Sequence, residues 1–112
     1  MRIAIPLTGG TLSAHFGHCE EFALVDVDDA QNGIVATEVV AAPQHEPGLL
    51  PPWLADRGVN VVIAGGMGMR AQELFAAHNI DVAVGAAADS PEALALAYAN
   101  GKLEGGPNIC DH

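Results

Sequence analysis

The stretch "VNVVIAGGMGMRAQELFAAHNIDVAVGA" (residues 59–86) contains the pattern that decides the fold. It begins with a continuous apolar run, 59–65, which is typical of a strand buried on both faces. A glycine turn and a helix are predicted over 66–79, and a second apolar strand over 80–86. A strand, a helix and a second strand in this order predict a parallel pair joined by a right-handed crossover.

The segments before this unit predict three more strands. Residues 2–7 and 21–27 are rich in β-branched and apolar side chains, and 34–42 continues the pattern. The turn-forming residues 28–33 join the last two strands as an antiparallel hairpin. Residues 8–19 lack periodicity and are predicted to form a loop.

Two further helices complete the pattern. A short one is predicted over 51–56, after a proline-rich loop. The other spans 89–101 and has clear end signals, with Ser90 as N-cap, Pro91 at the first helical position and Gly101 just past the end. The order β-β-β-α-β-α-β-α therefore predicts a three-layer α/β fold with a mixed five-stranded sheet. We expect a single domain over 1–112, in which 103–112 form an irregular tail.

Charge and hydropathy exclude several classes of protein. The formal net charge is −10, and the chain has only four lysines and arginines. Phosphate contacts need basic residues, so a nucleic-acid surface is disfavoured, as is binding to an anionic membrane. No apolar stretch approaches the roughly 20 residues of a membrane helix. "MRIAIPL" is not followed by a signal-peptide core, so we expect a soluble cytoplasmic protein.

Metal-binding side chains cluster in two short motifs. "HFGHC" contains His15, His18 and Cys19, and "NICDH", at the other end of the sequence, contains Cys110 and His112. Imidazole and thiolate are the ligands of zinc, iron–sulfur and other soft-metal sites. Together the two motifs supply up to five nitrogen and sulfur ligands, provided that the fold brings them together.

Each motif also has a plain structural interpretation. "HFGHC" can be a turn before a strand, with Phe16 in the core and Cys19 as a small buried residue. "NICDH" can be a terminus with incidental residues. A disulfide between the two cysteines is conceivable, but it is not the default state in the cytosol. Neither motif alone is as specific as a paired CxxC.

The segment "AGGMGMRA" (64–71) is the third candidate. Backbone N–H groups at a strand–turn–helix junction can bind anions, and Arg70 in the first helical turn could contact one. The segment is neither GxGxxG nor a P-loop, so nucleotide binding is weakly supported. A turn that needs glycine for its geometry is the alternative. Ligand sites of α/β sheets lie at the carboxyl ends of the strands, which makes "HFGHC" and "GGMG" predicted neighbours.

Four segments together resemble a known family. "MRIAIPL", "HFGHCEEF", "VVIAGGMGMRA" and "GPNICDH" are similar to the dinitrogenase iron–molybdenum cofactor biosynthesis family. This family includes NifX, the C-terminal part of NifB and many small stand-alone proteins of anaerobes. The resemblance covers essentially the whole chain. It implies a ribonuclease H-like α/β fold without nuclease activity, and the first strand indeed has no acidic residue to hold Mg²⁺.

The resemblance also implies a function and a site. It implies a non-catalytic binding or carrier protein for an iron–sulfur or iron–molybdenum–sulfur cluster, served by metallocluster donor and acceptor proteins. Two groups of residues match the family's motifs: His15, Phe16 and Gly17, and then Gly65, Gly66, Met67 and Gly68. The remaining candidate metal ligands are not found in every member: His18, Cys19, Cys110 and His112.

Two other functions stay open from the residues alone. The same His and Cys residues could hold a single Zn-like ion with a structural or sensory role. An enzyme is disfavoured, because the sequence has no CxxC pair, no Ser/His/Asp arrangement and no phosphate loop. A monomer and a homodimer bridged by a cluster are both compatible with only two cysteines per chain.

Overall fold

The structure is a computed structural model that describes residues 1–13, 16, 19–28, 30, 33–44, 46 and 48–103. Its helices and strands, in chain order, are β1 (Arg2–Thr8), β2 (Thr11–Leu12), β3 (Glu21–Asp28), β4 (Gly33–Ala41), α1 (Leu50–Ala55), β5 (Val61–Ile63), α2 (Met69–Ala77), β6 (Asp81–Ala83) and α3 (Pro91–Ala99).

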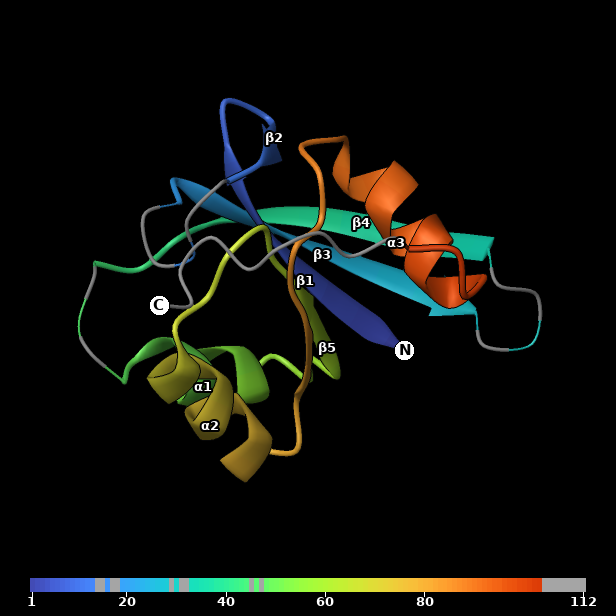
Figure 1. The fold of residues 1–112 in the computed structure, drawn as a ribbon. Helices are drawn as coiled ribbons and strands as arrows, with labels where there is room; N and C mark the ends of the chain where they lie inside the picture. The colour runs from blue at the N-terminus through green and yellow to red at the C-terminus, as the bar shows by residue number, and fades with distance from the viewer. Residues whose placement is uncertain are drawn as a thin grey trace.

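One mixed sheet organises these elements (Figure 1). The strand order is β4-β3-β1-β5-β6, and β2 pairs with β1 beside this path. β1 runs antiparallel to β3, with Ile3 opposite Val25, and parallel to β5, with Ile3 opposite Val61. β5 runs parallel to β6, with Val62 opposite Val82. The predicted mixed sheet and its β-α-β unit are therefore confirmed.

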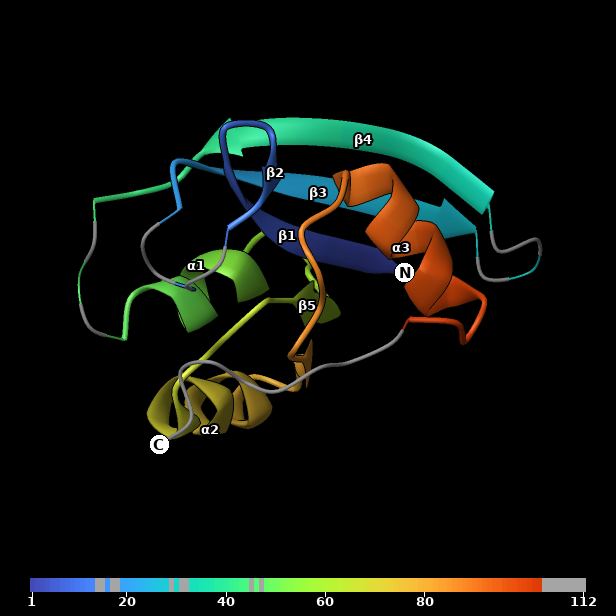
Figure 2. The same cartoon turned by 45° about the horizontal axis from the view of Figure 1, so that its top comes forward.

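The helices form the two outer layers (Figures 1 and 2). α1 and α2 cover one face of the sheet, where Leu54 and Phe75 join a core cluster with Phe22 of β3. α3 covers the other face, where Leu94 packs with Ile3 and its neighbours. Both faces of the central strands are thus buried, which is why residues 61–65 are apolar throughout, whereas Asn60 before them is exposed. The three-layer α/β prediction is confirmed.

Several element boundaries differ from those predicted. The expected loop over 8–19 contains the short strand β2, which folds back on β1 through a turn with positive φ at Gly9 and Gly10. The helix expected over 66–79 begins only at Met69, because the glycines before it form an extended turn. β5 and β6 are three residues each. Apolar patterns mark which residues are buried, but they do not mark where a hydrogen-bonded ladder ends.

Two of the four cationic side chains are engaged near the start of β1. Arg2 forms a two-pronged ion pair with Asp26 of β3, with N···O distances of 2.8 and 3.2 Å. This hydrogen bonding raises the pKa of the Arg2 guanidinium. Arg2 also donates to the carbonyl of Arg57, and the Arg57 guanidinium lies 3.6 Å from the centre of the Trp53 ring. These cations therefore join secondary-structure elements at the edge opposite the carboxyl end of β1.

The predicted start of α3 is confirmed. The hydroxyl of Ser90 accepts a hydrogen bond from the N–H of Ala93 at 3.2 Å, and Pro91 is the first helical residue. Among the described helices, none is long and apolar enough to cross a membrane.

We expect Ser90→Ala to lower the free energy of unfolding by about 1 kcal/mol, because the first turn of α3 loses its capping acceptor. Urea denaturation followed by circular dichroism measures the change. Ser90→Asp retains an acceptor and should stay within about 0.5 kcal/mol of the wild type. Equal stability of the alanine and aspartate variants would contradict this capping role.

Candidate functional site

The loop after β1 returns to the strand that it leaves. The N–H of Ser13 donates to the carbonyl of Pro6 at 2.8 Å, and the N–H of Glu20 donates to the carbonyl of Leu7 at 2.8 Å. The Glu20 carboxylate also accepts from the N–H of Gly9 at 3.0 Å. The end of β1 thus holds both ends of the segment that contains "HFGHC".

Phe16 joins this loop to the glycine turn. Its N–H donates to the carbonyl of Gly66 at 3.1 Å. Its ring packs edge-on against Phe75 of α2, with centroids 5.4 Å apart, and lies 6.0 Å from the ring of Phe22. The prediction that "HFGHC" and "GGMG" are neighbours is confirmed. The contact needs β1 and β5 to be parallel, so that both loops emerge at one edge of the sheet.

The glycine turn is held from several sides. Gly65 and Gly66 are buried, and the Met67 side chain is 1% exposed, within the core beneath α2. The side-chain amide of Gln72 donates to the carbonyl of Met67 at 2.9 Å. The N–H of Gly85, just after β6, donates to the carbonyl of Gly65 at 3.0 Å. Met67 therefore faces the interior with its side chain and can reach a ligand only through its backbone.

The backbone geometry at position 68 does not require a glycine. The φ and ψ of Gly68 are −66° and 156°, which any residue adopts. A Cβ at this position would meet nothing within 4 Å. Gly68 is also the N-cap of α2, a position where serine, threonine, aspartate, asparagine and glycine are all common. At this position the backbone geometry does not require glycine.

The start of α2 is open and free of acidic side chains. The first turn contains no Asp or Glu, and it carries Arg70 and Met69 exposed, with Met69 at 57%. The N-cap residue is a glycine, so the N-cap position supplies no side-chain acceptor to the N–H groups of this turn. A helix N-terminus of this kind carries a partial positive charge and presents N–H donors to an anion.

The candidate ligands are only partly within the described residues. Cys19 is half-buried and packs, like Phe16, against the core cluster shared with α1 and α2. The described residues contain no group of three or more His, Cys, Asp or Glu side chains that could hold a metal ion. The other predicted members of the site lie outside the described residues, and these are His15, Gly17, His18, Cys110 and His112.

Comparison with known proteins shows the family of this chain. The sequence profile described as "Dinitrogenase iron-molybdenum cofactor" matches residues 1–101. The chain belongs to the dinitrogenase iron–molybdenum cofactor family. An uncharacterised protein of Methanocaldococcus jannaschii is 32% identical over 107 residues, which cover 93% of this chain and 90% of that protein.

Solved structures agree with the family fold. The crystal structure of PH0822 superposes with a TM-score of 0.84 at 34% identity, covering 93% of each chain. The apo form of the orange protein from Desulfovibrio gigas superposes with a TM-score of 0.74 at 23% identity, covering 96% of this chain and 93% of that one. The second likeness concerns the fold alone.

Sequence reasoning missed two residues that hold the glycine turn in place. Gln72 fixes the Met67 carbonyl from one turn inside α2. Gly85 has φ of 82°, a conformation that favours glycine, where the chain turns beside Gly65. The sequence offered one signal for the second residue, a glycine directly after an apolar strand. A glutamine on a helix gives no comparable signal.

We expect the rings of Phe16 and Phe75 to be energetically coupled. In a double-mutant cycle with Phe16→Leu and Phe75→Leu, the coupling free energy should be about 0.5–1.5 kcal/mol, because the edge-on contact is lost only once. Urea denaturation of the four proteins measures it.

Tyr98 supplies the control for this cycle. It packs in the core cluster under α3, on the other face of the sheet from Phe16. A cycle of Phe16→Leu with Tyr98→Leu should therefore give a coupling below about 0.5 kcal/mol. Equal couplings in the two cycles would show that the Phe16 ring does not specifically anchor the loop on α2.

Proposed function

We propose that this protein is a non-catalytic binding and carrier protein for an anionic metal–sulfur cluster of the iron–sulfur or iron–molybdenum–sulfur type. The cluster is its cargo. One observation carries the proposal: the loop with Cys19 is bonded through Phe16 to the glycine turn, directly before the open N-terminus of α2. Membership of the cofactor family supports the same class of cargo.

Because the chain as a whole is negative, an anionic cluster can be attracted only by groups close to the site. A net charge of −10 repels an anion at long range. At the site, the partial positive charge of α2 and the exposed Arg70 oppose this repulsion. The carboxylate of Glu20 at the nearby loop end accepts a hydrogen bond from Gly9. The favourable groups act only at short range, which suits binding that is specific and reversible.

The available donors fit a soft, sulfide-bearing cargo. In the proposal, the thiolate of Cys19 ligates the cluster, with His15 and His18 of the same loop assisting. Cys110 and His112 complete the set. Two thiols per chain are few for a whole iron–sulfur cluster, which usually takes four. Hydrogen bonds from the N–H groups of the α2 N-terminus, or a second copy of the chain sharing the cluster, would supply the remaining contacts.

A carrier must also release what it binds. A site built on a loop, with few protein ligands, lets a donor protein load the cluster and an acceptor protein remove it. The proposal includes such metallocluster donor and acceptor proteins as partners in the cytoplasm. The proposal also assigns the fold to the ribonuclease H-like class. Nuclease chemistry is not part of the proposal, because β1 has no acidic residue to hold Mg²⁺.

We expect the chain to bind iron and acid-labile sulfide together when it is reconstituted without oxygen, with absorption in the visible range. Cys19→Ser should lose most of this absorption, because a thiolate ligand is replaced by a hydroxyl. Metal and sulfide analysis with an absorption spectrum measures both. His78→Gln is the control, since His78 is an exposed imidazole at the far end of α2 from Gly68.

Each outcome of this experiment separates the candidate functions. Full retention of colour in Cys19→Ser would remove Cys19 from the site. One colourless metal ion per chain without sulfide would favour the mononuclear Zn-like site, and the thermal stability would then rise with metal concentration. Equal loss of colour in His78→Gln would show non-specific binding by imidazoles.

We expect Gly68→Ser to separate stability from binding. The hydroxyl oxygen of a serine at the N-cap accepts a hydrogen bond from a first-turn N–H group, so the free energy of unfolding should stay level or rise by about a few tenths of a kcal/mol. The same side chain occupies the donors proposed for the cluster. Affinity for the reconstituted cluster should therefore fall about tenfold, which corresponds to one charge-assisted hydrogen bond.

Gly33→Ser is the matched control for this variant. A Cβ at Gly33 also meets nothing within 4 Å, and this glycine begins the edge strand β4. Its substitution should leave cluster binding unchanged. If Gly68→Ser binds the cluster as tightly as the wild type, the N-terminus of α2 plays no part in the site.

A further inference from the structure

Two neighbouring carbonyls of the glycine turn accept hydrogen bonds from two different segments of the chain. The carbonyl of Gly66 accepts from the N–H of Phe16, in the loop after β1, at 3.1 Å. The carbonyl of Met67 accepts from the side-chain amide of Gln72, in α2, at 2.9 Å. The first donor belongs to the backbone, whereas the second is a side chain that a substitution can remove.

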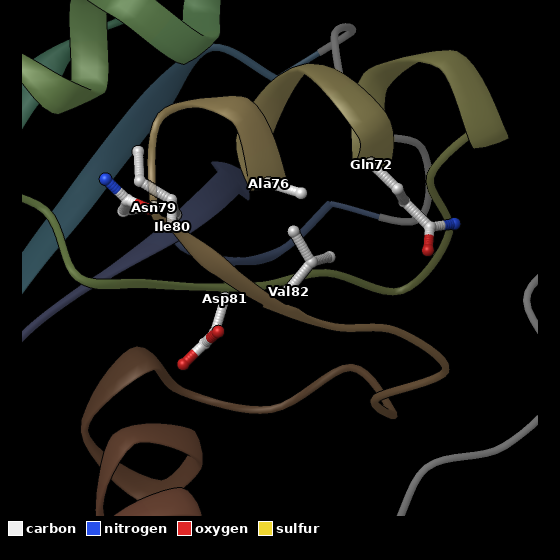
Figure 3. A pocket seen from close by; sticks show the side chains of 6 residues that line it. All are labelled: Gln72, Ala76, Asn79, Ile80, Asp81 and Val82. Carbon is white, nitrogen blue, oxygen red and sulfur yellow. The ribbon is translucent and has the colours of Figure 1, made fainter.

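Gln72 reaches the turn from a groove between α2 and β6. The groove has a volume of about 430 Å³ and is lined by Gln72, Ala76, Asn79, Ile80, Asp81 and Val82. Figure 3 shows Gln72 at one end of the groove, with Asn79 and Ile80 at the other. Gln72 is half-buried, so its hydrogen bond to Met67 is partly shielded from water. Loss of a hydrogen bond in such a place is not simply made good by bulk water.

The hydrogen bond from Gln72 sets the direction of the peptide unit between Met67 and Gly68. A trans peptide is planar, and its C=O and N–H point in opposite directions. Because the Met67 carbonyl faces the Gln72 amide, the N–H of Gly68 points away from Gln72. This N–H lies directly before the first turn of α2, where the helix carries its partial positive charge.

Gly68 allows this peptide unit a second orientation. Rotation of the peptide by half a turn would take φ of Gly68 from −66° into the positive range, while ψ stays near 156°. That combination is adopted almost only by glycine. In the rotated state a carbonyl oxygen would replace the N–H at the start of α2, and it would repel an anion instead of attracting it. A residue that permits both orientations leaves the choice to the hydrogen bond.

We propose that Gln72 is a positioning residue of the candidate site. Its side-chain amide holds the peptide between Met67 and Gly68 in the orientation that presents an N–H to an anionic ligand. The same hydrogen bond steadies the adjoining peptide, whose carbonyl, that of Gly66, binds the N–H of Phe16 and keeps the loop after β1 in place. The effect on the backbone needs no ligand, whereas its effect on cluster binding rests on the proposed function.

Amide hydrogen exchange of the full, chelator-treated chain, followed by NMR, tests the positioning without metal. Gln72→Met removes the donor and keeps the length of the side chain, so exchange of the Phe16 amide should become about tenfold faster. Gln44→Met is the matched control, because Gln44 is an exposed glutamine in the loop before α1. The amide of Ala64, which donates to Ala83, is the internal reference and should keep its exchange rate in every variant.

Gln72→Glu makes the hydrogen bond depend on pH. An ionised carboxylate cannot donate to the Met67 carbonyl, whereas a protonated carboxyl can. The observed orientation therefore favours the protonated form and raises the pKa of the introduced carboxyl above its usual value of about 4.3. Exchange of Phe16, compared with the wild type at the same pH, should be about tenfold faster near pH 7 and nearly equal at about pH 4. Gln44→Glu should match the wild type at both.

A second substitution tests the part played by Gly68. A Cβ at this position would meet nothing within 4 Å, so Gly68→Ala leaves the observed orientation intact. Alanine disfavours the rotated state, because that state needs a positive φ. Added to Gln72→Met, Gly68→Ala should therefore bring the exchange rate of Phe16 back to within about twofold of the wild type.

Several outcomes of the metal-free experiments would overturn the proposal. Unchanged exchange of Phe16 in Gln72→Met is one, and a Gln72→Glu variant without pH dependence is another. Faster exchange of Ala64 together with Phe16 would also overturn it, since it would show a loss of overall stability. Failure of Gly68→Ala to restore slow exchange would remove the rotated peptide from the explanation and overturn the role of Gln72 in choosing its direction.

Anaerobic reconstitution with iron and sulfide tests the consequence for the cargo. Gln72→Met should bind the cluster about tenfold more weakly than Gln44→Met, as is usual for loss of a residue that orients a site. If the wild type binds the cluster and Gln72→Met binds it equally tightly, Gln72 does not position the site. If the wild type binds no cluster, the proposed function fails, while the exchange of Phe16 still decides whether Gln72 positions the turn.

Discussion

The parallel pairing of β1 with β5 is the constraint on which the rest of this structure depends. Because the two strands run in the same direction, the loop after β1 and the glycine turn after β5 emerge at one edge of the sheet. The Phe16–Gly66 hydrogen bond and the contact of Phe16 with Phe75 then join them. If β1 paired with β5 in the antiparallel sense, "HFGHC" would lie at the opposite edge from Gly68, and the candidate site would not form.

The site combines firm support with open donors. The core holds Phe16, Met67 and one side of Cys19, and Gln72 fixes the peptide before Gly68. The N-cap of α2 is a glycine, which supplies no side-chain acceptor to the N–H groups of the first turn. Serine at this position would stabilise the helix by roughly a few tenths of a kcal/mol. In the proposed function this position lies at the cluster, and a small loss of stability at a functional site is common.

The negative charge of the chain shapes what such a site can do. With 14 acidic and four basic residues, the protein repels anions until they reach the edge of the sheet. Arg2 and Arg57 are used to join strands and α1 at the other edge, so they do not assist. In the proposed function, binding of the cluster then depends on short-range ligation and N–H donors. The proposal therefore favours transfer between proteins that dock closely over capture of a free anion from solution.

The sequence by itself determined the layers, the β-α-β unit and the cap of α3, because burial periodicity and end-capping chemistry are local properties of the chain. It also predicted that "HFGHC" and "GGMG" would be neighbours, since strand direction places both at one edge. Only the tertiary structure decided that β2 pairs within the expected loop, that Met67 faces the core and that Gln72 holds its carbonyl. The extended conformation of Gly68, whose φ of −66° requires no glycine, also appeared only there. These features depend on where backbone groups from distant segments meet, and a local pattern of residue types contains no such distances.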